Sequence, residues 1–432
     1  MTTGVLDVLI AGKLAGTLSQ DGAGSLSFAY GRGYRGVPLS SSMPLSTRPY
    51  RGKAVLPYLW GLLPEDPAAR RHVAADAGIS PNNPFALLGV IGLDCPGAVQ
   101  FVPQGSDACR DERLVAVSDA EIARRLAIGR QDGAGWVADN EHWSLGGQQS
   151  KFALRRMDGR WYSCEGSAAT THILKSGVRG LAHQALNEYV CMRLARSLDV
   201  PAASAEYLEF EGEGGVEPAI VIERYDRLVE GDSVTRLHQE DLCQALGCLP
   251  DNKYTMYGGP NCAEVLGLLT STGPTAQANA AGFLQMLFLN YLLAATDAHA
   301  KNYSIMLAAD GSHRLAPMYD VASIAPYVEG AKLKVKPPKL AMSIGGENRA
   351  GRVSANDLAK LVKQCDLERL GITAEGCRDL LALYAEEIPG KLAQEFDALE
   401  KTGSADAARE LRGRMEEPIA QLCARSLKGL RS

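Results

Sequence analysis

Residues 280–295, AAGFLQMLFLNYLLAA, are apolar almost all round, and the polar run TDAHAKN follows them at once. A helix without a polar face must be buried, so this segment predicts a helix at the centre of a helical lobe. It is shorter than the roughly 20 apolar residues that a membrane span needs, and Gln285 and Asn290 interrupt it. The polar run after it is therefore predicted to lie at the end of a rigid, buried element.

The composition is that of a folded globular protein. The chain has 432 residues, which exceeds the size of one core, so two or three domains are expected. A net charge of −5 argues against binding to nucleic acid or anionic membranes through overall electrostatics. No signal sequence or membrane-length apolar run appears, so we expect a cytoplasmic protein with no membrane partner. The cysteines have neither C-x-x-C nor zinc spacing and are expected to be reduced.

The residue pattern divides the chain into three parts. Residues 1–105 alternate short strand-like runs with glycine and proline turns before a helical patch, which predicts a small mixed subdomain. Residues 106–227 contain several strands and one amphipathic helix, which predicts a small sheet lobe. From about residue 238 onwards helical periodicity dominates, with a helix expected at 240–247, so a helical lobe is predicted at 228–432.

Two acidic residues and an amide stand at informative spacing after the apolar segment. Asp297 and Asn302 have the D-x-x-x-x-N spacing of a kinase catalytic loop, and Asp320 follows a predicted hairpin. Phosphoryl transfer needs one carboxylate to accept the proton of the attacking hydroxyl, while a second carboxylate and an amide oxygen hold Mg²⁺. These residues are therefore candidates for a reaction centre that uses Mg-ATP.

The other parts of such a site can be sought upstream. Lys175 ends the predicted strand HILK and could pair with phosphate oxygens, and Glu188 on the next helix could pair with that lysine. Gly146 and Gly147 lie in a turn between strands, where backbone N–H groups can approach phosphates, and Lys151 ends that turn. These residue types stand in the order in which kinases have them.

A further segment, AIVIERYDR, joins the small sheet to the helical part and offers backbone groups of Glu223, Arg224 and Tyr225 to an adenine edge. Each feature alone has a simpler explanation, because lone aspartates and asparagines are usually turn or cap residues. His299 alone would be an ordinary loop histidine. The complete order of features nevertheless favours the kinase interpretation.

Three other motifs carry little weight. The glycines of GRGYRG, residues 31–36, match G-x-G-x-x-G, but no helix follows, so dinucleotide binding is not indicated. No P-loop motif occurs. Lys332, Lys334 and Lys336 would lie on one side of an extended segment that runs to Lys339. That stripe is either simply solvated or a contact for an anionic partner such as tRNA or DNA.

Many runs of the chain resemble the HipA family, the serine/threonine kinase toxins of bacterial toxin–antitoxin pairs. The resemblance implies an α+β, two-lobed protein-kinase-like fold with an extra N-terminal subdomain at residues 1–105. The matching runs are PLSSSMPLSTRPYRG, LPYLWGLLPED, FALLGVIGLDCPGAVQF, SLGGQQSKFAL, THILK, NEYVCMRLARSL, VIERYDR, HQEDLCQALG, TDAHAKN, LAPMYDV and LAMSIGGENR.

The resemblance also implies roles for individual residues. Asp297 matches the catalytic base, and Asn302 and Asp320 match the Mg²⁺ ligands. Ser144 matches a serine whose autophosphorylation switches such kinases off by expelling the nucleotide loop, and a dianionic phosphate there would repel ATP. The positions implied to bind ATP are Gly146, Gly147, Gln148, Gln149, Ser150, Lys151, Lys175, Glu223, Arg224, Tyr225, His299, Asn302, Tyr319 and Asp320.

The chain departs from the family and from other kinases at a few places. Ser176 stands where family members often have proline, and the loop reads GGQQ rather than a GAQ type. The motif around Asp320 is Y-D-V rather than D-F-G, and D-x-H-x-x-N is closer to lipid kinases. None of these departures removes a catalytic group, but they leave open which kind of molecule accepts the phosphoryl group.

The resemblance implies a toxin that transfers the γ-phosphoryl group of Mg-ATP to a protein hydroxyl, with an aminoacyl-tRNA synthetase as the target and arrested translation as the outcome. It also implies a helix-turn-helix, HipB-like antitoxin that brings the toxin to operator DNA; a dimer within that complex is left open. Two alternatives remain: a kinase-shaped corepressor that acts mainly with its DNA-binding partner, and a small-molecule or lipid kinase.

Overall fold

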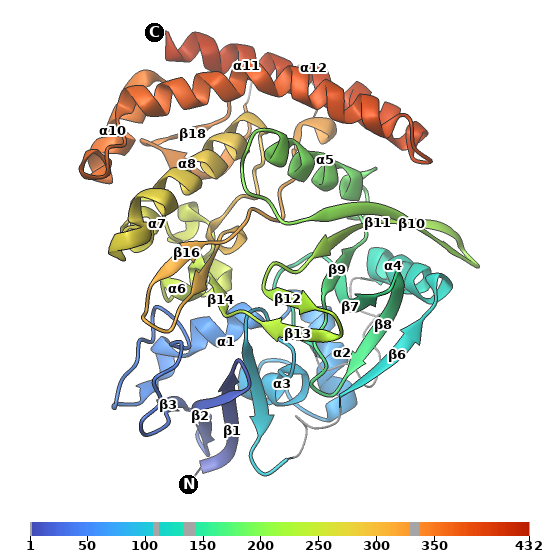
Figure 1. The fold of residues 1–432 in the computed structure, drawn as a ribbon, viewed down its shortest axis with the longest axis vertical. Coiled ribbons are helices and arrows are strands. Elements are labelled where there is room, and N and C mark those ends of the chain that lie inside the picture. The colour runs from blue at the N-terminus through green and yellow to red at the C-terminus, as the bar shows by residue number, and fades with distance from the viewer. Residues whose placement is uncertain (1, 107–111, 133–142, 329–336, 432) are drawn as a thin grey trace. The chain divides into compact units, whose positions relative to one another are not determined.

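The computed structural model describes residues 2–106, 112–132, 143–328 and 337–431 (Figure 1). It divides into two compact units, each described by itself below. The first unit comprises Met1–Gly180, Glu206–Asp251 and Ser304–His313, and the second comprises Leu181–Ala205, Asn252–Tyr303 and Arg314–Ser432. The limits of the three predicted domains stay a prediction.

The first unit begins with an antiparallel sheet of order β4-β3-β2-β1-β5 and three helices. Apolar side chains of the strands, such as Val8 and Phe28, form one core with Tyr58 of α1. The elements are β1 Thr2–Ile10, β2 Lys13–Asp21, β3 Leu26–Tyr30, β4 Tyr50–Arg51, β5 Val99–Pro103, α1 Leu56–Leu62, α2 Pro67–Ala77 and α3 Pro84–Ile91.

Local sequence explains where these helices start and stop. Asp66 precedes α2 and its side chain accepts a hydrogen bond from the N–H of Ala68 at 2.8 Å, which satisfies one of the N–H groups left open at a helix start. Proline follows at the first helical position, where its missing N–H costs nothing. Gly78 ends α2 in the left-handed conformation that glycine adopts without strain. The helical patch predicted before residue 105 is confirmed.

A second sheet of the first unit has the order β10-β11-β9-β7-β8-β6. Ile122 and Leu126 of α4 pack with Phe152, Leu154 and Trp161 of the sheet. The elements are β6 Arg113–Val117, α4 Asp119–Asp132, β7 Lys151–Met157, β8 Arg160–Glu165, β9 His172–Lys175, β10 Ala205–Gly212 and β11 Gly215–Glu223. The several strands predicted in residues 106–227, HILK among them, are confirmed.

Short elements follow the second sheet. They are β12 Arg227–Glu230, β13 Ser233–Arg236, β14 Gln239–Asp241, α6 Leu242–Ala245, β15 Ser304–Leu307 and β16 His313–Leu315. The helix predicted at 240–247 is wrong in extent, because residues 239–241 pair with residues 304–306 as strands. Only a single turn of helix remains at α6, which Asp241 and Gln244 cap reciprocally.

The second unit is helical. Its helices are α5 Gln184–Ser197, α7 Cys262–Leu269, α8 Ala276–Leu292, α10 Ala355–Gln364, α11 Ala374–Leu399 and α12 Ala405–Leu430, with the hairpin β17 Lys339–Ile344 and β18 Glu347–Arg349. The long helices α11 and α12 lie side by side (Figure 1). The side chains of α8 from Phe283 to Leu292 are almost all buried, so the predicted central helix is confirmed.

The mixture of sheets and helices confirms the predicted α+β class. Among the residues that the structure describes, no helix is long and apolar enough to cross a membrane. The cysteines in those residues are free thiols.

Candidate active site

The loop that carries the predicted catalytic residues is anchored to the end of α8. The chain turns at Ala294, whose φ of 50° is left-handed, and the N–H of Ala295 returns to the carbonyl of Asn290 at 2.9 Å. The amide Nδ2 of Asn290 donates to the Tyr303 hydroxyl at 2.8 Å, on the far side of the loop. Both ends of the loop are therefore held by one buried helix.

Within this loop, Asp297 and Asn302 are joined directly. The Asn302 side chain donates from Nδ2 to the carbonyl oxygen of Asp297 at 2.8 Å. The N–H of His299 donates to the same carbonyl at 2.8 Å, and the N–H of Asn302 donates to the carbonyl of His299 at 2.9 Å. The D-x-x-x-x-N spacing thus corresponds to one compact, hydrogen-bonded turn.

The Asp297 carboxylate points outward and has an aromatic neighbour. Its side chain is 71% exposed, and the hydroxyl of Tyr254 donates to Oδ1. The His299 Nε2 lies 3.7 Å from the same oxygen, and the rings of Tyr254 and His299 meet edge to face with centroids 4.9 Å apart. A phenol and an imidazole therefore border one side of the carboxylate.

His299 is buried and neutral. Burial lowers its pKa to about 3, and the nearby Lys253 ammonium adds to this, while the Asp320 carboxylate acts in the opposite direction. The ring is therefore uncharged near neutral pH and forms no ion pair with Asp297. Since Asp320 also acts on this ring, His299 lies within electrostatic reach of both predicted catalytic carboxylates.

Asp320 has an unusual backbone. Its φ of 56° lies in the left-handed region, which non-glycine residues rarely adopt. Non-glycine residues with this conformation are concentrated at functional sites. The preceding Tyr319 donates its hydroxyl to the carbonyl of Lys301 at 3.0 Å. This bond ties the Asp320 segment to the loop that carries Asp297 and Asn302.

The donor types fit a magnesium ion. In the described residues no three His, Cys, Asp or Glu side chains form a complete metal cluster. Mg²⁺ in phosphoryl transfer needs no such cluster, because one or two protein oxygens and the phosphates share its coordination with water. Asn302 directs Nδ2 toward Asp297, so its Oδ1 points elsewhere. An amide oxygen and the Asp320 carboxylate are ligands that this ion accepts.

The predicted phosphate-binding residues lie in the first unit. Gly147 has a φ of 104°, a backbone conformation that residues with a Cβ rarely adopt, so glycine suits this turn. Strand register places Lys151 directly opposite Lys175. Gln149 donates from Nε2 to the carbonyl of Ser176 at 2.7 Å, which ties the loop to the end of β9.

Ser144, before the glycine turn, is fully buried. Its hydroxyl donates to the carbonyl of Leu62 at 2.6 Å, and its N–H donates to the carbonyl of Asp94 at 3.0 Å. The N–H of Glu65 donates to the carbonyl of Gly147 at 3.0 Å. Residues 144–147 are therefore bound to the N-terminal part of the chain.

The predicted adenine segment follows β11. Glu223 is exposed, whereas the side chain of Arg224 is only 2% exposed. The N–H of Arg224 donates to the carbonyl of Thr171, and the carbonyl of Arg224 accepts from the N–H of Arg227. The backbone polar groups of Arg224 are thus engaged within the protein.

The candidate residues are divided between the two units, so the Lys175–Glu188 pair stays a prediction. Lys332, Lys334 and Lys336 lie outside the described residues. Sequence reasoning missed Tyr254, because nothing in a single sequence links it to a carboxylate 43 positions away.

Comparison with known proteins assigns the chain to a family. Residues 6–102 match the model of the HipA N-terminal domain, and residues 143–392 match that of the HipA-like C-terminal domain. Y4mE of Sinorhizobium fredii is 33% identical over 382 residues, which cover 84% of this chain and 86% of that protein.

The serine/threonine-protein kinase toxin HipA of Shewanella oneidensis is 28% identical over 408 residues, which cover 90% of this chain and 88% of that protein. The solved complex of Shewanella oneidensis HipA, HipB and operator DNA contains a chain that matches 98% of this one, with 97% of that chain covered, a TM-score of 0.82 and 26% identity. The chain belongs to the HipA family.

Proposed function

We propose that the chain is a serine/threonine-protein kinase that transfers the γ-phosphoryl group of Mg-ATP to a protein hydroxyl. The observation that carries the proposal is the loop after α8, where the exposed Asp297 carboxylate and Asn302 share one hydrogen-bonded turn. The Shewanella relative, named a serine/threonine-protein kinase toxin, supports the same reaction class.

Asp297 is the proposed general base. An exposed carboxylate can orient an incoming hydroxyl and take up its proton as the oxygen attacks phosphorus. Tyr254 donates to Oδ1 and so restricts how the carboxylate rotates. His299 is neutral, so it adds no positive charge that would hold Asp297 as an ion pair.

Lys151, Lys175 and the glycine turn are the proposed phosphate-binding groups. Strand register places Lys151 opposite Lys175, so two residues that carry ammonium groups stand at paired positions beside the glycine turn, and such groups suit phosphate oxygens. Bound Mg²⁺ would neutralise charge on the phosphates, with Asn302 and Asp320 as its protein ligands. Glu223 and Tyr225 remain the proposed adenine contacts, and Arg224 acts through its buried side chain.

Ser144 is the proposed autophosphorylation site. In the structure its hydroxyl is buried and donates to Leu62. A phosphoserine has no such donor and carries roughly two negative charges. Because a carbonyl oxygen would repel those charges, phosphorylation requires residues 144–147 to leave this position and would keep them out.

The proposed partners follow from the relatives. The solved Shewanella structure is a complex of HipA, HipB and operator DNA, so a HipB-like antitoxin is the proposed protein partner, and operator DNA is reached mainly through it. An aminoacyl-tRNA synthetase is the proposed target, with arrest of translation and growth as the consequence.

The test is phosphorylation by the purified chain with labelled Mg-ATP, followed by phosphoproteomics of cells that express either wild type or Asp297→Ala. We expect label on Ser144 and on one dominant cellular protein, both lost in Asp297→Ala. Label only in low-mass products would favour a small-molecule kinase, and no label with intact repression would favour a corepressor. Ser144→Ala should retain activity over time, and silencing at the wild-type rate in that variant would exclude Ser144 as the switch.

A further inference from the structure

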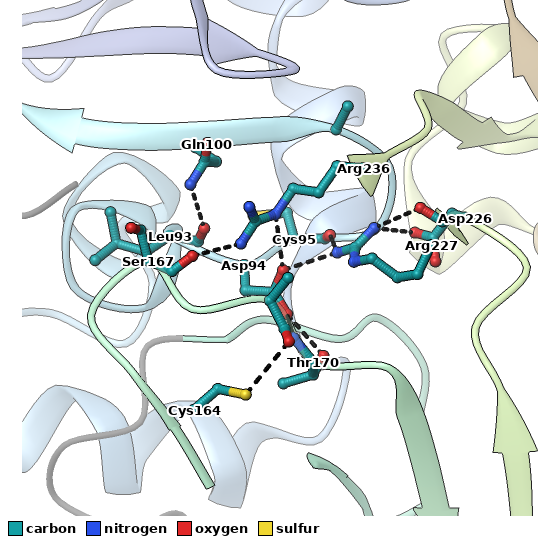
Figure 2. A network of polar contacts seen from close by, with 12 residues as sticks. Leu93, Asp94, Cys95, Gln100, Cys164, Ser167, Thr170, Asp226, Arg227 and Arg236 are labelled. Atoms are coloured by element: carbon teal, nitrogen blue, oxygen red, sulfur yellow. Dashed lines mark hydrogen bonds and ion pairs between the residues drawn. The ribbon is translucent and has the colours of Figure 1, made fainter. Parts of the chain in front are cut away.

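Asp94 lies between α3 and β5 and is the centre of a buried cluster of charges (Figure 2). Its residue exposure is 2%. Oδ1 accepts from Arg227 at 2.8 Å and from Arg236 at 3.1 Å. Oδ2 accepts from Arg224 at 3.2 Å and from the N–H and hydroxyl of Thr170 at 3.1 and 2.7 Å. Each carboxylate oxygen is therefore saturated with donors.

Asp226 is the second anion of this cluster. It accepts from Arg224 Nε and Nη2 at 3.0 and 2.9 Å, and from the N–H of Gly97 at 2.6 Å. Arg224 and Arg227 also donate to the carbonyl of Cys95, each at 2.9 Å. Residues 94–97 and residues 224–227 are thereby bound to each other through side chains and backbone together.

The cluster remains ionised despite its burial. Burial by itself would raise the pKa of Asp94, but Arg227, Arg224 and Arg236 outweigh it and hold the pKa below its ordinary value. Two carboxylates face three guanidinium groups, and the backbone carbonyls of Cys95 and Gly97 accept further N–H groups, while the buried Arg227 Nε has no partner among the described residues. Removing one charge would leave its partners buried without compensation, so this arrangement has few alternative geometries.

Asp94 also holds a second segment, through its main chain. The carbonyl oxygen of Asp94 accepts a hydrogen bond from the N–H of Ser144 at 3.0 Å. Asp94 and Trp143 also form an isolated parallel β-bridge. Ser144 precedes the glycine turn, and Arg224 lies in the segment after β11. One residue of the N-terminal part therefore contacts the proposed adenine segment at Arg224 and the residues that lead into the proposed phosphate-binding turn.

We propose that Asp94 is a positioning residue for ATP: its side chain fixes the segment 224–227 and its carbonyl fixes the segment that leads into the glycine turn, so that both are ordered before ATP binds. The inference rests on the proposed kinase function. Ordering both segments in advance reduces the conformational entropy lost on binding. The chemical groups Asp297 and Asn302 belong to a separate loop, so Asp94 should affect the KM for ATP and leave kcat nearly unchanged.

The test compares full-length wild type with Asp94→Asn, which keeps the shape but removes the charge. We expect the KM for ATP to rise about tenfold and kcat to stay within about threefold, because charge-assisted hydrogen bonds to the arginines are lost while the reacting groups are untouched. Hydrogen exchange should become faster in peptides that cover 143–150 and 224–227 together. Val8→Ala is the matched control, since Val8 is fully buried in β1 of the same unit, in a core cluster whose members come from neither segment. This variant should lower Tm without changing the KM.

A milder variant keeps the test valid if Asp94→Asn folds poorly. Arg236 is 11% exposed, and Arg236→Gln leaves two arginines facing two aspartates, so the fold should persist with a KM for ATP raised about threefold. A lower Tm with unchanged KM and unchanged exchange in either variant would overturn the inference, because Asp94 would then be structural only. Wild-type protein that shows no saturable ATP binding would overturn the proposed function itself, and this inference with it.

Discussion

Two sets of charged residues in this chain differ in burial and in what surrounds them. The Asp94 side chain is 3% exposed and faces three arginines, whereas the Asp297 side chain is 71% exposed and faces a phenol and a neutral imidazole. A carboxylate surrounded by fixed cations holds segments in place and cannot take part in proton transfer. A carboxylate that reaches solvent beside uncharged rings can receive a proton from an incoming hydroxyl.

The difference in burial also means that the Asp94 cluster and Asp297 contribute differently to the stability of the fold. Burying ions is costly, and their attraction offsets that cost only while every partner remains. The Asp94 cluster meets this condition, because each carboxylate and guanidinium group has several partners. Asp297 lost little hydration on folding, so the fold depends little on it. Stability and activity should therefore respond in opposite ways to changes in the two sets.

The largest expected effect is on activity at Asp297. Asp297→Asn should lower the rate of phosphoryl transfer about 10³-fold, because the amide cannot accept the proton. The free energy of unfolding should stay within about 0.5 kcal/mol of wild type, as is usual for exposed positions. Transfer of labelled phosphate and urea unfolding measure the two quantities.

Asp310→Asn is the matched control for that variant. Asp310 is an exposed turn residue that accepts from the N–H of Ser312 at 2.9 Å, so its replacement should leave the rate unchanged. Equal rates for wild type and Asp297→Asn would show that Asp297 is not the base. The exposed carboxylate would then differ from the Asp94 cluster in burial but not in function.

The next effect is on stability at Asp94. Asp94→Ala should lower the free energy of unfolding by about 3 kcal/mol or more, since it leaves buried arginines without their anion. Asp297→Ala, a change of the same side chain at an exposed site, serves as the control and should cost little. Urea unfolding of both variants measures the difference, and equal losses would mean that the buried cluster contributes no more than a surface aspartate.

A third carboxylate sharpens the comparison through pH. Glu240 is fully buried like Asp94, but its hydrogen-bond partners in the described part of the chain are serines: it accepts from the Ser40 hydroxyl at 2.5 Å and from the N–H of Ser41 at 2.7 Å. Burial raises its pKa to about 7. The folded state therefore keeps this proton after the unfolded state has lost it.

The sign of the resulting pH effect is opposite for the two buried acids. For Glu240, stability falls as pH rises from about 4.5 to about 7, by about 3 kcal/mol. For Asp94, whose pKa is lowered, stability is present above the ordinary pKa and is lost as pH falls below it. Urea unfolding of wild type should show a lower free energy of unfolding at pH 8 than at pH 5, and Glu240→Gln should show a much smaller difference. The same decrease in both proteins would exclude Glu240 as its source.

Local patterns were sufficient for much of the fold. The all-round apolar run predicts α8, because a segment without a polar face must be buried, and the strand predicted at HILK is β9. The helix expected at 240–247 failed because strand pairing with residues 304–306 overrides its local preference. No element was predicted at 113–132, where the structure has β6 and α4.

The long-range polar contacts lay beyond such patterns. Asp94 and Arg224 are 130 positions apart, and a single sequence contains no signal that pairs one buried aspartate with one arginine among many. The compact turn of Asp297 and Asn302 was accessible because both residues lie within one local motif. The nucleotide-binding roles inferred by resemblance stay predictions, since they depend on groups from both units.

The smallest effect concerns Tyr254, whose neutral hydroxyl donates to Asp297 as the Thr170 hydroxyl donates to Asp94. Tyr254→Phe removes the donor to Asp297 Oδ1 and should lower kcat about fivefold, with the KM for ATP unchanged, because one hydrogen bond that orients the base is worth about 1 kcal/mol. Tyr257→Phe is the control: that ring lies 6.1 Å from Tyr254 and is 62% exposed. Steady-state phosphorylation rates compare the two. Equal rates would mean that Asp297 needs no such donor, whereas a faster Tyr254→Phe would mean that the phenol holds the carboxylate away from the acceptor hydroxyl and limits the reaction.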